Sequence, residues 1–329
     1  MLKTTYLPAV AGLALCATGA SAETPVLQVM TYDSFVTEWG PGPAIETAFE
    51  AECACDLQFV GAGDGAALLA RLQLEGPQTD ADVVLGLDTN LIVAARKTGL
   101  FAPHGVDAEL SLPVAWADAE FLPFDWGYFA FVGNKGAAAP TSLRSLADSD
   151  IKIVIQDPRS STPGLGLLMW VKTAYDDQAA GLWADLADNI VTVTPGWSEA
   201  YGMFLEGEAD AVLSYTTSPA YHLIAEEDDS KTAWGFDEGH YMQVEVAGKV
   251  AGTDQSELAD KFMAFMLSDA FQGVIPTTNW MYPSVTPDSG LPAGFETLHT
   301  PATALLLSPT DAANMRDVAL DEWRTALSK

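Results

Sequence analysis

Two extended stretches, FDWGYFAFV at residues 124–132 and HYMQVEVA at residues 240–247, decide the fold that this sequence predicts. Both are rich in aromatic and β-branched residues, which favour β-strands. They enclose a block in which strand and helix patterns alternate, and a similar block precedes the first stretch. A chain that enters a second α/β block and then returns predicts two lobes joined by two crossing strands. In such a fold, a ligand binds in the cleft between the lobes.

The alternation itself favours an α/β architecture with largely parallel sheets. In the first block, we predict strands at 25–31, 57–61 and 82–87 and helices at 44–52, 66–74 and 90–98. In the second block, we predict strands at 151–155, 190–193 and 211–214 and helices at 164–175, 179–187 and 199–205. Two more helices are predicted at 258–267, which is strongly amphipathic, and at 311–327.

The N-terminus predicts an export signal at residues 1–22. Lys3 gives a positive start, residues 7–16 form a short apolar run, and Ala20-Ser21-Ala22 offers a cleavage site. That run is too short to cross a bilayer, and no later stretch reaches the roughly 20 apolar residues that a span needs. We therefore expect a soluble mature chain. Its predicted divisions are lobe 1 at 23–127, lobe 2 at 128–244, and a return to lobe 1 with C-terminal helices at 245–329.

The charge of the chain excludes one class of function. Its 329 residues include 45 Asp and Glu against 15 Lys and Arg, which gives a net charge of −30. Such a chain is repelled by phosphate backbones and by anionic membrane surfaces, so nucleic-acid binding is excluded. The same sign favours cationic ligands, although solubility in salty surroundings is the simpler explanation.

Two cysteines remain after removal of the signal, Cys53 and Cys55. In an oxidising compartment a disulfide between them is the first expectation, ahead of free thiols. A catalytic thiolate is the weakest alternative, because it needs a base partner that the sequence does not locate. The four histidines, at 104, 222, 240 and 299, are neither near these cysteines nor spaced like a zinc site, so no metal is predicted.

No motif of a nucleotide-binding or hydrolytic enzyme occurs in the chain. Two loops between strand and helix patterns instead offer binding groups. The first is GAGDG at residues 61–65, where backbone N–H groups suit polar ligand atoms, although a tight turn explains it as well. The second is DPRSSTPGLG at residues 157–166, where Ser161 and Thr162 precede a helix. Capping alone explains Thr162, but the pair of hydroxyls favours a binding loop.

Aromatic residues gather in three further loops. PGWSE at 195–199 carries Trp197, SYTTSPAYH at 214–222 carries Tyr215 and Tyr221, and TNWMYP at 278–283 carries Trp280. Core packing is the ordinary role of Trp and Tyr, but these residues follow no periodic face. Aromatic faces together with a carboxylate suit a flat cationic ligand, since each good cation–π contact contributes roughly 0.5–2 kcal/mol.

Long sequence blocks carry a resemblance that covers nearly the whole mature chain. They include YDSF at 32–35, WGPGP at 39–43, ADVVLGLD at 81–88, STPGLG at 161–166, GWSEAYG at 196–202 and NWMYP at 279–283. These blocks resemble the periplasmic thiamine-binding proteins of bacterial ABC importers. The resemblance implies a two-lobed type II periplasmic-binding-protein fold and a periplasmic location. It also implies capture of thiamine and its mono- and diphosphate, and delivery to a membrane permease driven by an ATPase. We expect a monomer with no cofactor.

The resemblance also implies a set of ligand-binding residues. Carried over position by position, they are Asp64, Gly65, Ser161, Thr162, Trp197, Tyr215, Thr216, Thr217, Ser218, Tyr221 and Trp280. Asp64 would supply negative charge or accept hydrogen bonds from the aminopyrimidine. Tyr221 and Trp280 would lie on the two faces of the thiazolium. The hydroxyls at 161–162 and the loop at 215–218 would meet the hydroxyethyl or phosphate end.

Two other functions compete with this interpretation. Thiamine-degrading transferases share the two-lobed fold and use a cysteine in the cleft, but Cys53 and Cys55 follow the first predicted helix, away from the cleft loops. Iron carriers of similar architecture commonly use two adjacent tyrosines, whereas Tyr215 and Tyr221 are six positions apart. We therefore expect a binding protein that leaves its ligand unaltered.

Overall fold

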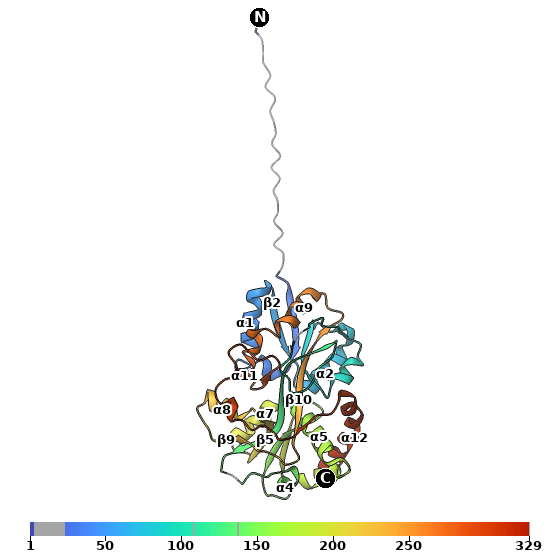
Figure 1. Cartoon of the computed structure of the whole chain (residues 1–329). Helices are drawn as coiled ribbons and strands as arrows, with labels where there is room; N and C mark the ends of the chain where they lie inside the picture. The colour runs from blue at the N-terminus through green and yellow to red at the C-terminus, as the bar shows by residue number, and fades with distance from the viewer. Residues whose placement is uncertain (3–23, 108, 137, 329) are drawn as a thin grey trace.

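The first lobe is built on parallel strands whose apolar runs are covered by helices (Figure 1). The computed structural model describes residues 1–2, 24–107, 109–136 and 138–328, so the predicted export signal lies outside the described residues except for its first two. Strands β1 (Val26–Thr31), β2 (Asp56–Gly61) and β3 (Val83–Asp88) alternate with helices α1 (Gly42–Cys53), α2 (Gly65–Glu75) and α3 (Ile92–Arg96). Each lies within a few residues of its predicted range.

The second lobe repeats this plan. Its strands are β6 (Ile153–Gln156), β7 (Ile190–Thr194), β8 (Ala211–Tyr215) and the short β9 (Lys231–Ala233). Its helices are α4 (Leu143–Ala147), α5 (Thr162–Tyr175), α6 (Ala179–Leu186), α7 (Trp197–Leu205) and α8 (Pro219–Ala225). Strand β6 is parallel to both β7 and β8. The carboxyl ends of these strands therefore face the same side, from which their following loops project.

Two long strands connect the lobes, β5 (Phe121–Asn134) and β10 (His240–Val250). Residues 121–128 of β5 pair with β10, whereas residues 129–133 pair with β8. Strand β10 also pairs with β3, so the strand order is β2-β1-β3-β10-β5-β8-β6-β7. Figure 1 shows both strands running between the end marked by α1 and the end marked by α4. The predicted lobe boundaries, at 127/128 and 244/245, fall inside these strands and stay a prediction.

The sheet is mixed rather than largely parallel, which corrects the expectation from the alternating pattern. Strand β10 is antiparallel to β3 and β5, and β5 is antiparallel to β8. The reason is the return of the chain, because a strand that leaves one lobe and a strand that comes back run in opposite directions. The parallel rule therefore holds only for the strands linked by crossover helices.

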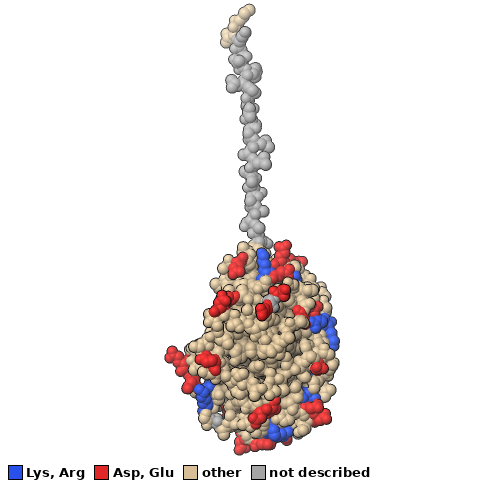
Figure 2. Space-filling model, in the orientation of Figure 1, with Lys and Arg blue, Asp and Glu red and all other residues tan. Residues whose placement is uncertain are grey.

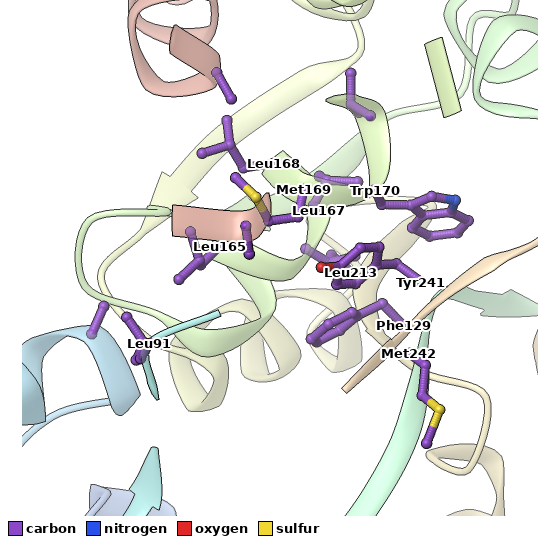
Figure 3. Close-up of a cluster of buried hydrophobic side chains, with 14 of the residues drawn as sticks. Leu91, Phe129, Leu165, Leu167, Leu168, Met169, Trp170, Leu213, Tyr241 and Met242 are labelled. Carbon is purple, nitrogen blue, oxygen red and sulfur yellow. The ribbon is translucent and has the colours of Figure 1, made fainter. Parts of the chain in front are cut away.

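The core lies around α5, whose residues from Thr162 to Lys172 are all buried. Figure 3 shows Leu165, Leu168 and Trp170 of this helix beside Phe129 of β5 and Tyr241 of β10. At Gly166 an added Cβ would lie 2.1 Å from the Phe129 ring, so only glycine permits this approach of helix and strand. The close packing fixes the start of α5 relative to the crossing strands.

The remaining elements return to the first lobe and then cross to the second. Helices α9 (Ser256–Phe265), α10 (Asp269–Gln272) and α11 (Ile275–Thr278) precede the short strand β11 (Tyr282–Pro283). The short strands β4 (Phe101–Ala102) and β12 (Ala304–Leu305) pair with β10. The last helix, α12 (Pro309–Leu327), packs against α5 and α6 and also contacts α3. It therefore contacts both lobes, and in Figure 1 it lies on the right of the molecule while α11 lies on the left.

A disulfide joins Cys53, the last residue of α1, to Cys55, just before β2.

Acidic side chains are spread over the visible face instead of forming one patch (Figure 2). Within the described ranges, no helix combines the length and the apolar character that crossing a bilayer requires.

Candidate ligand-binding cleft

A cavity of about 520 Å³ lies between the two lobes. Most of its wall is apolar or aromatic, and its polar groups come from loops, from the first turns of helices and from strands β8 and β10. The lining includes Tyr32, Trp39, Asp64, Thr162, Trp197, Tyr201, Tyr215, Ser218, Tyr221, Glu245, Asn279, Trp280 and Met281. This volume lies within the range of roughly 300–1,000 Å³ that is typical of small-molecule sites.

The second-lobe side of the cavity is built by three strand-to-helix junctions. Thr162 follows β6 at the start of α5, Trp197 begins α7 after β7, and the segment 215–218 joins β8 to α8. Because β6, β7 and β8 are parallel, their carboxyl ends bring these loops to one edge. The structure thus brings together seven of the eleven predicted residues as cavity lining: Asp64, Thr162, Trp197, Tyr215, Ser218, Tyr221 and Trp280.

Asp64 joins the two lobes across the cleft. Its Oδ2 accepts a hydrogen bond from Ser161 Oγ at 2.7 Å and another from the backbone N–H of Trp197 at 3.1 Å. The next residue, Gly65, donates its N–H to Thr162 Oγ1 at 3.2 Å. Gly65 and Ser161 therefore act behind Asp64 and Thr162, and neither lines the cavity itself. Because these bonds bring the two lobes into contact, the structure has a closed cleft.

The burial of Asp64 also alters its acidity. Removal from water raises the pKa of this carboxyl to about 6, although the hydrogen bonds from Ser161 and Trp197 oppose the shift. At neutral pH the carboxylate is thus ionised but poorly hydrated. Such a group attracts a cation or a hydrogen-bond donor more strongly than an exposed carboxylate does.

Two of the predicted residues, Thr216 and Thr217, do not line the cavity. Both are fully buried. Thr216 donates its N–H to the carbonyl of Tyr128, and the Thr217 hydroxyl points at the sulfur of Met281 at 3.9 Å. Among the residues at 215–218, Tyr215 and Ser218 face the cavity, and the Ser218 hydroxyl hydrogen-bonds that of Ser214 at 2.7 Å.

Tyr221 and Trp280 form a corner, and not two parallel faces as expected. Their ring centroids are 5.4 Å apart and the rings meet at 73°. A ligand ring stacked between two parallel rings needs each of them about 3.5 Å away. The contact between Tyr221 and Trp280 leaves no such space between their rings. Trp280 follows the C-cap of α11 and has a φ of +56°, a left-handed conformation usually taken by glycine. The helix end therefore sets the direction of the indole.

The floor of the cavity contains groups that we did not predict from the sequence. Glu245 of β10 is 5% exposed and lines the cavity, and its register partner on β5 is the fully buried Asp125. Tyr32 Oη lies 3.2 Å from Glu245 Oε2, and Asn279 Nδ2 donates to Asp125 Oδ2 at 2.6 Å. The signal was present in the sequence, because both acids interrupt the stretches that otherwise predict buried strands.

The two floor acids face each other as register partners on β5 and β10. Burial raises the pKa of Asp125 to about 7. Burial, followed by the negative charge of Asp125, raises the pKa of Glu245 well above its ordinary value. Two neighbouring buried carboxyls resist ionising together, because like charges repel strongly away from water. The pair therefore favours retaining a proton near neutral pH.

One group of described residues has the composition of a metal site. Ligand atoms of His222, Glu226 and Asp228 lie within 4.8 Å of one another. Each residue is already engaged, because His222 bonds Tyr201 and Glu226 through its two ring nitrogens, and Asp228 accepts from Ser230. Glu226 also accepts from Tyr221 Oη at 2.9 Å. The group thus forms a hydrogen-bonded support for one wall of the cleft.

Comparison with known proteins places the chain among transport proteins. Residues 43–276 match the family model described as bacterial extracellular solute-binding protein. The thiamine-binding periplasmic protein of Salmonella typhimurium is 54% identical, with 100% of both chains covered. Its counterpart from Escherichia coli is also 54% identical, covering 96% of this chain and 98% of the relative. A solved structure of a periplasmic thiamin binding protein has a TM-score of 0.91 and 54% identity, covering 93% of this chain and 97% of that one.

Proposed function

The chain belongs to the bacterial extracellular solute-binding proteins, and among them to the thiamine-binding periplasmic proteins, and from this premise we propose that its cleft captures thiamine. It is the solute-binding component of an ABC import system and works in the periplasm, as a transport component and not as an enzyme. The observation that carries the proposal is the cavity between the lobes, where aromatic walls lie above acidic groups.

The proposed contacts follow from the chemistry of the ligand. The thiazolium would lie in the corner of Tyr221 and Trp280, stacked on one ring and touching the edge of the other. Asp64 would meet a positively charged or hydrogen-bond-donating part of the vitamin. Thr162 and Ser218 would bond the hydroxyethyl group, while Gly65 and Ser161 hold Asp64 and Thr162 in position. Thr216 and Thr217 would support the cavity wall from behind.

We further propose that the monophosphate and diphosphate of thiamine bind in the same cleft. Helices α5 and α7 both begin at the cavity, with Thr162 and Trp197 as their first residues. Backbone N–H groups at a helix N-terminus favour an anion such as a phosphate. The acids of the floor would repel that anion, and Asp64 already accepts the first N–H of α7, so we propose that the phosphate lies at the start of α5, beside Thr162.

Delivery would depend on closure of the lobes. A ligand favours the closed form only through its higher affinity for that form. The cross-lobe bonds of Asp64 and Thr162 exist only when the lobes meet, so closure and ligand capture are linked at these residues. We propose that the closed monomer then docks on a membrane permease whose transport step is driven by a cytoplasmic ATPase.

Calorimetric titration of the purified chain with thiamine, its two phosphates and pyrithiamine tests this function. We expect one site per monomer for thiamine and both phosphates, with the monomer checked by light scattering. The absence of heat and of any thermal shift with thiamine would refute the proposal. If thiamine binds but the phosphates do not, only the phosphate part is wrong.

A further inference from the structure

Three acids stand side by side across the middle of the sheet. Glu245 of β10 is the register partner of Asp88 on β3 and also of Asp125 on β5. Asp88 and Asp125 are fully buried, and Glu245 is 5% exposed, toward the cavity. Like charges directly opposite each other on neighbouring strands destabilise a sheet. Stability alone therefore does not explain this row.

The row lacks a protein cation next to the cavity. Among the described residues, no Lys or Arg forms an ion pair with any of the three acids. Asp88 faces Arg316 of α12 and accepts from the side chain of Asn90 at 2.8 Å. Asn90 thus satisfies Asp88 by hydrogen bonds and Arg316 contributes positive charge near it, whereas Glu245 and Asp125 form no ion pair with a cation of the described residues.

The groups that face Glu245 are polar but neutral, apart from the two acids. Tyr32, after β1, lies beside Glu245 and bonds Asn279, which follows α11. Tyr215 of β8 donates to Gln243 and so lies next to the same cavity floor. Asp125 Oδ1 is buried without a hydrogen-bond partner among the described residues, and Glu245 lies opposite Asp125 on the neighbouring strand. The floor therefore has capacity for one positive charge, and the cavity opens onto it.

From this geometry we propose that Glu245, paired with Asp125, is the residue that selects a positively charged ring over a neutral one in this cleft. With one proton between them, the two carboxyls carry one negative charge, which equals the one permanent charge of a thiazolium. The inference rests on the proposed function, because it assigns the recognition of charge within that same site. It adds a second acidic contact, on the crossing strand, to that of Asp64.

The proposal predicts that binding of a cation is coupled to the release of protons from Glu245 and Asp125. A cation above the pair favours the form with one proton over the form with two, so binding near pH 6 releases protons from pairs that hold two. Raising the pH removes protons from the pair before the ligand arrives. The affinity for a cation therefore increases as the pH rises from 6 to 8, whereas the affinity for a neutral analogue does not.

The test uses Glu245→Gln in the full mature chain, with Glu257→Gln as the matched control. Glu257 is exposed in the first turn of α9, and its substitution removes the same unit of charge far from the cavity. Each variant is titrated at pH 8 with thiamine and with thiamine thiazolone, the uncharged 2-oxo analogue. We expect E245Q to bind thiamine about 10- to 100-fold more weakly and the neutral analogue within about threefold of wild type. E257Q should bind both ligands like the wild type.

The outcomes separate the possible failures. If E245Q binds thiamine as tightly as the wild type, or loses both ligands equally, Glu245 does not select charge and the inference is wrong. If the wild type does not bind thiamine, the proposed function itself fails. Should E245Q not fold, as judged by its circular dichroism, the wild type is titrated with both ligands from pH 6 to 8. The comparison is then repeated with Asp64→Asn, which removes the other titrating carboxyl of the cavity. An affinity for thiamine that does not vary with pH in D64N overturns the proposal, and one that still rises supports it.

Discussion

Ser161→Ala tests the link between closure and binding most directly. The Ser161 hydroxyl donates to Asp64 across the cleft at 2.7 Å, and the side chain is fully buried. Ser161 is also the N-cap of α5, but its side chain makes no capping hydrogen bond. Removing the hydroxyl therefore weakens the contact between the lobes without removing a bond that holds the helix.

The magnitude depends on the ionisation of Asp64. A hydrogen bond to a charged acceptor contributes about 1.5–3 kcal/mol, and one between neutral groups about 0.5–1.5 kcal/mol. Because the pKa of Asp64 is about 6, the charged bond is present at pH 8 and largely absent at pH 5. We expect S161A to weaken thiamine binding about 10- to 100-fold at pH 8, but only about 2- to 10-fold at pH 5.

Calorimetry at both pH values measures the affinity, and small-angle scattering measures closure. The matched control is Ser160→Ala, because the Ser160 hydroxyl bonds the carbonyl of Pro195 within the second lobe. S160A should bind like the wild type and S161A should shift the ligand-free ensemble toward the open form. An S161A variant with wild-type affinity at pH 8 would show that this bond contributes nothing to capture.

Three further predictions follow from other parts of the molecule. Burial raises the pKa of Asp125 to about 7 and raises the pKa of Glu245 well above its ordinary value, so the folded state retains protons that the unfolded state has lost. The melting temperature of the ligand-free protein should therefore fall from pH 6 to pH 8, and a rising value in calorimetric scans would contradict the assignment. Trp280→Ala should weaken thiamine binding by about 0.5–2 kcal/mol or more, measured by titration against a Trp126→Phe control outside the cavity lining. Replacing Cys53 and Cys55 by Ser should lower the free energy of unfolding in urea by about 1–2 kcal/mol, because the loop that the disulfide closes is short. The affinity for thiamine should not change, because both cysteines lie outside the cavity lining. A lower affinity would argue for the thiolate alternative.

Much of the site could be predicted because its residues lie where strands are followed by helices, and the sequence shows these positions. Ser161, Trp197 and Tyr215 each lie at the junction of a short strand with the helix that follows it, and parallel strands bring such junctions to one edge. The two crossing strands were predicted from their length and composition. The antiparallel pairing at the centre was not, because local patterns contain no information on the direction in which a returning strand pairs.

The floor of the cavity could not be predicted from local patterns alone. Glu245 and Asp125 are more than a hundred positions apart and meet only through the register of β5 and β10. The corner of Tyr221 and Trp280 likewise depends on the left-handed backbone at Trp280, which no propensity favours. Thr216 and Thr217 lie outside the cavity lining although their hydroxyls suit a ligand, because the loop turns both side chains behind the wall, where Thr217 contacts Met281.

The arrangement of charges also explains how closing the cleft can depend on the ligand. Closure buries Asp64 over a floor that already contains Glu245 and Asp125, so without a cation the closed form gathers negative charge in a poorly hydrated space. Bonds from Ser161 and Trp197 offset part of that cost, but they are present whatever the cleft contains. A shift from mostly open to mostly closed needs a difference in affinity of about 5.5 kcal/mol between the two forms. A cationic ring supplies such a difference by neutralising the buried charge, whereas a neutral ring of the same shape fills the cavity and leaves the repulsion in place. The acids therefore make closure itself selective, so that a neutral analogue able to enter the open cleft would still fail to hold the lobes together.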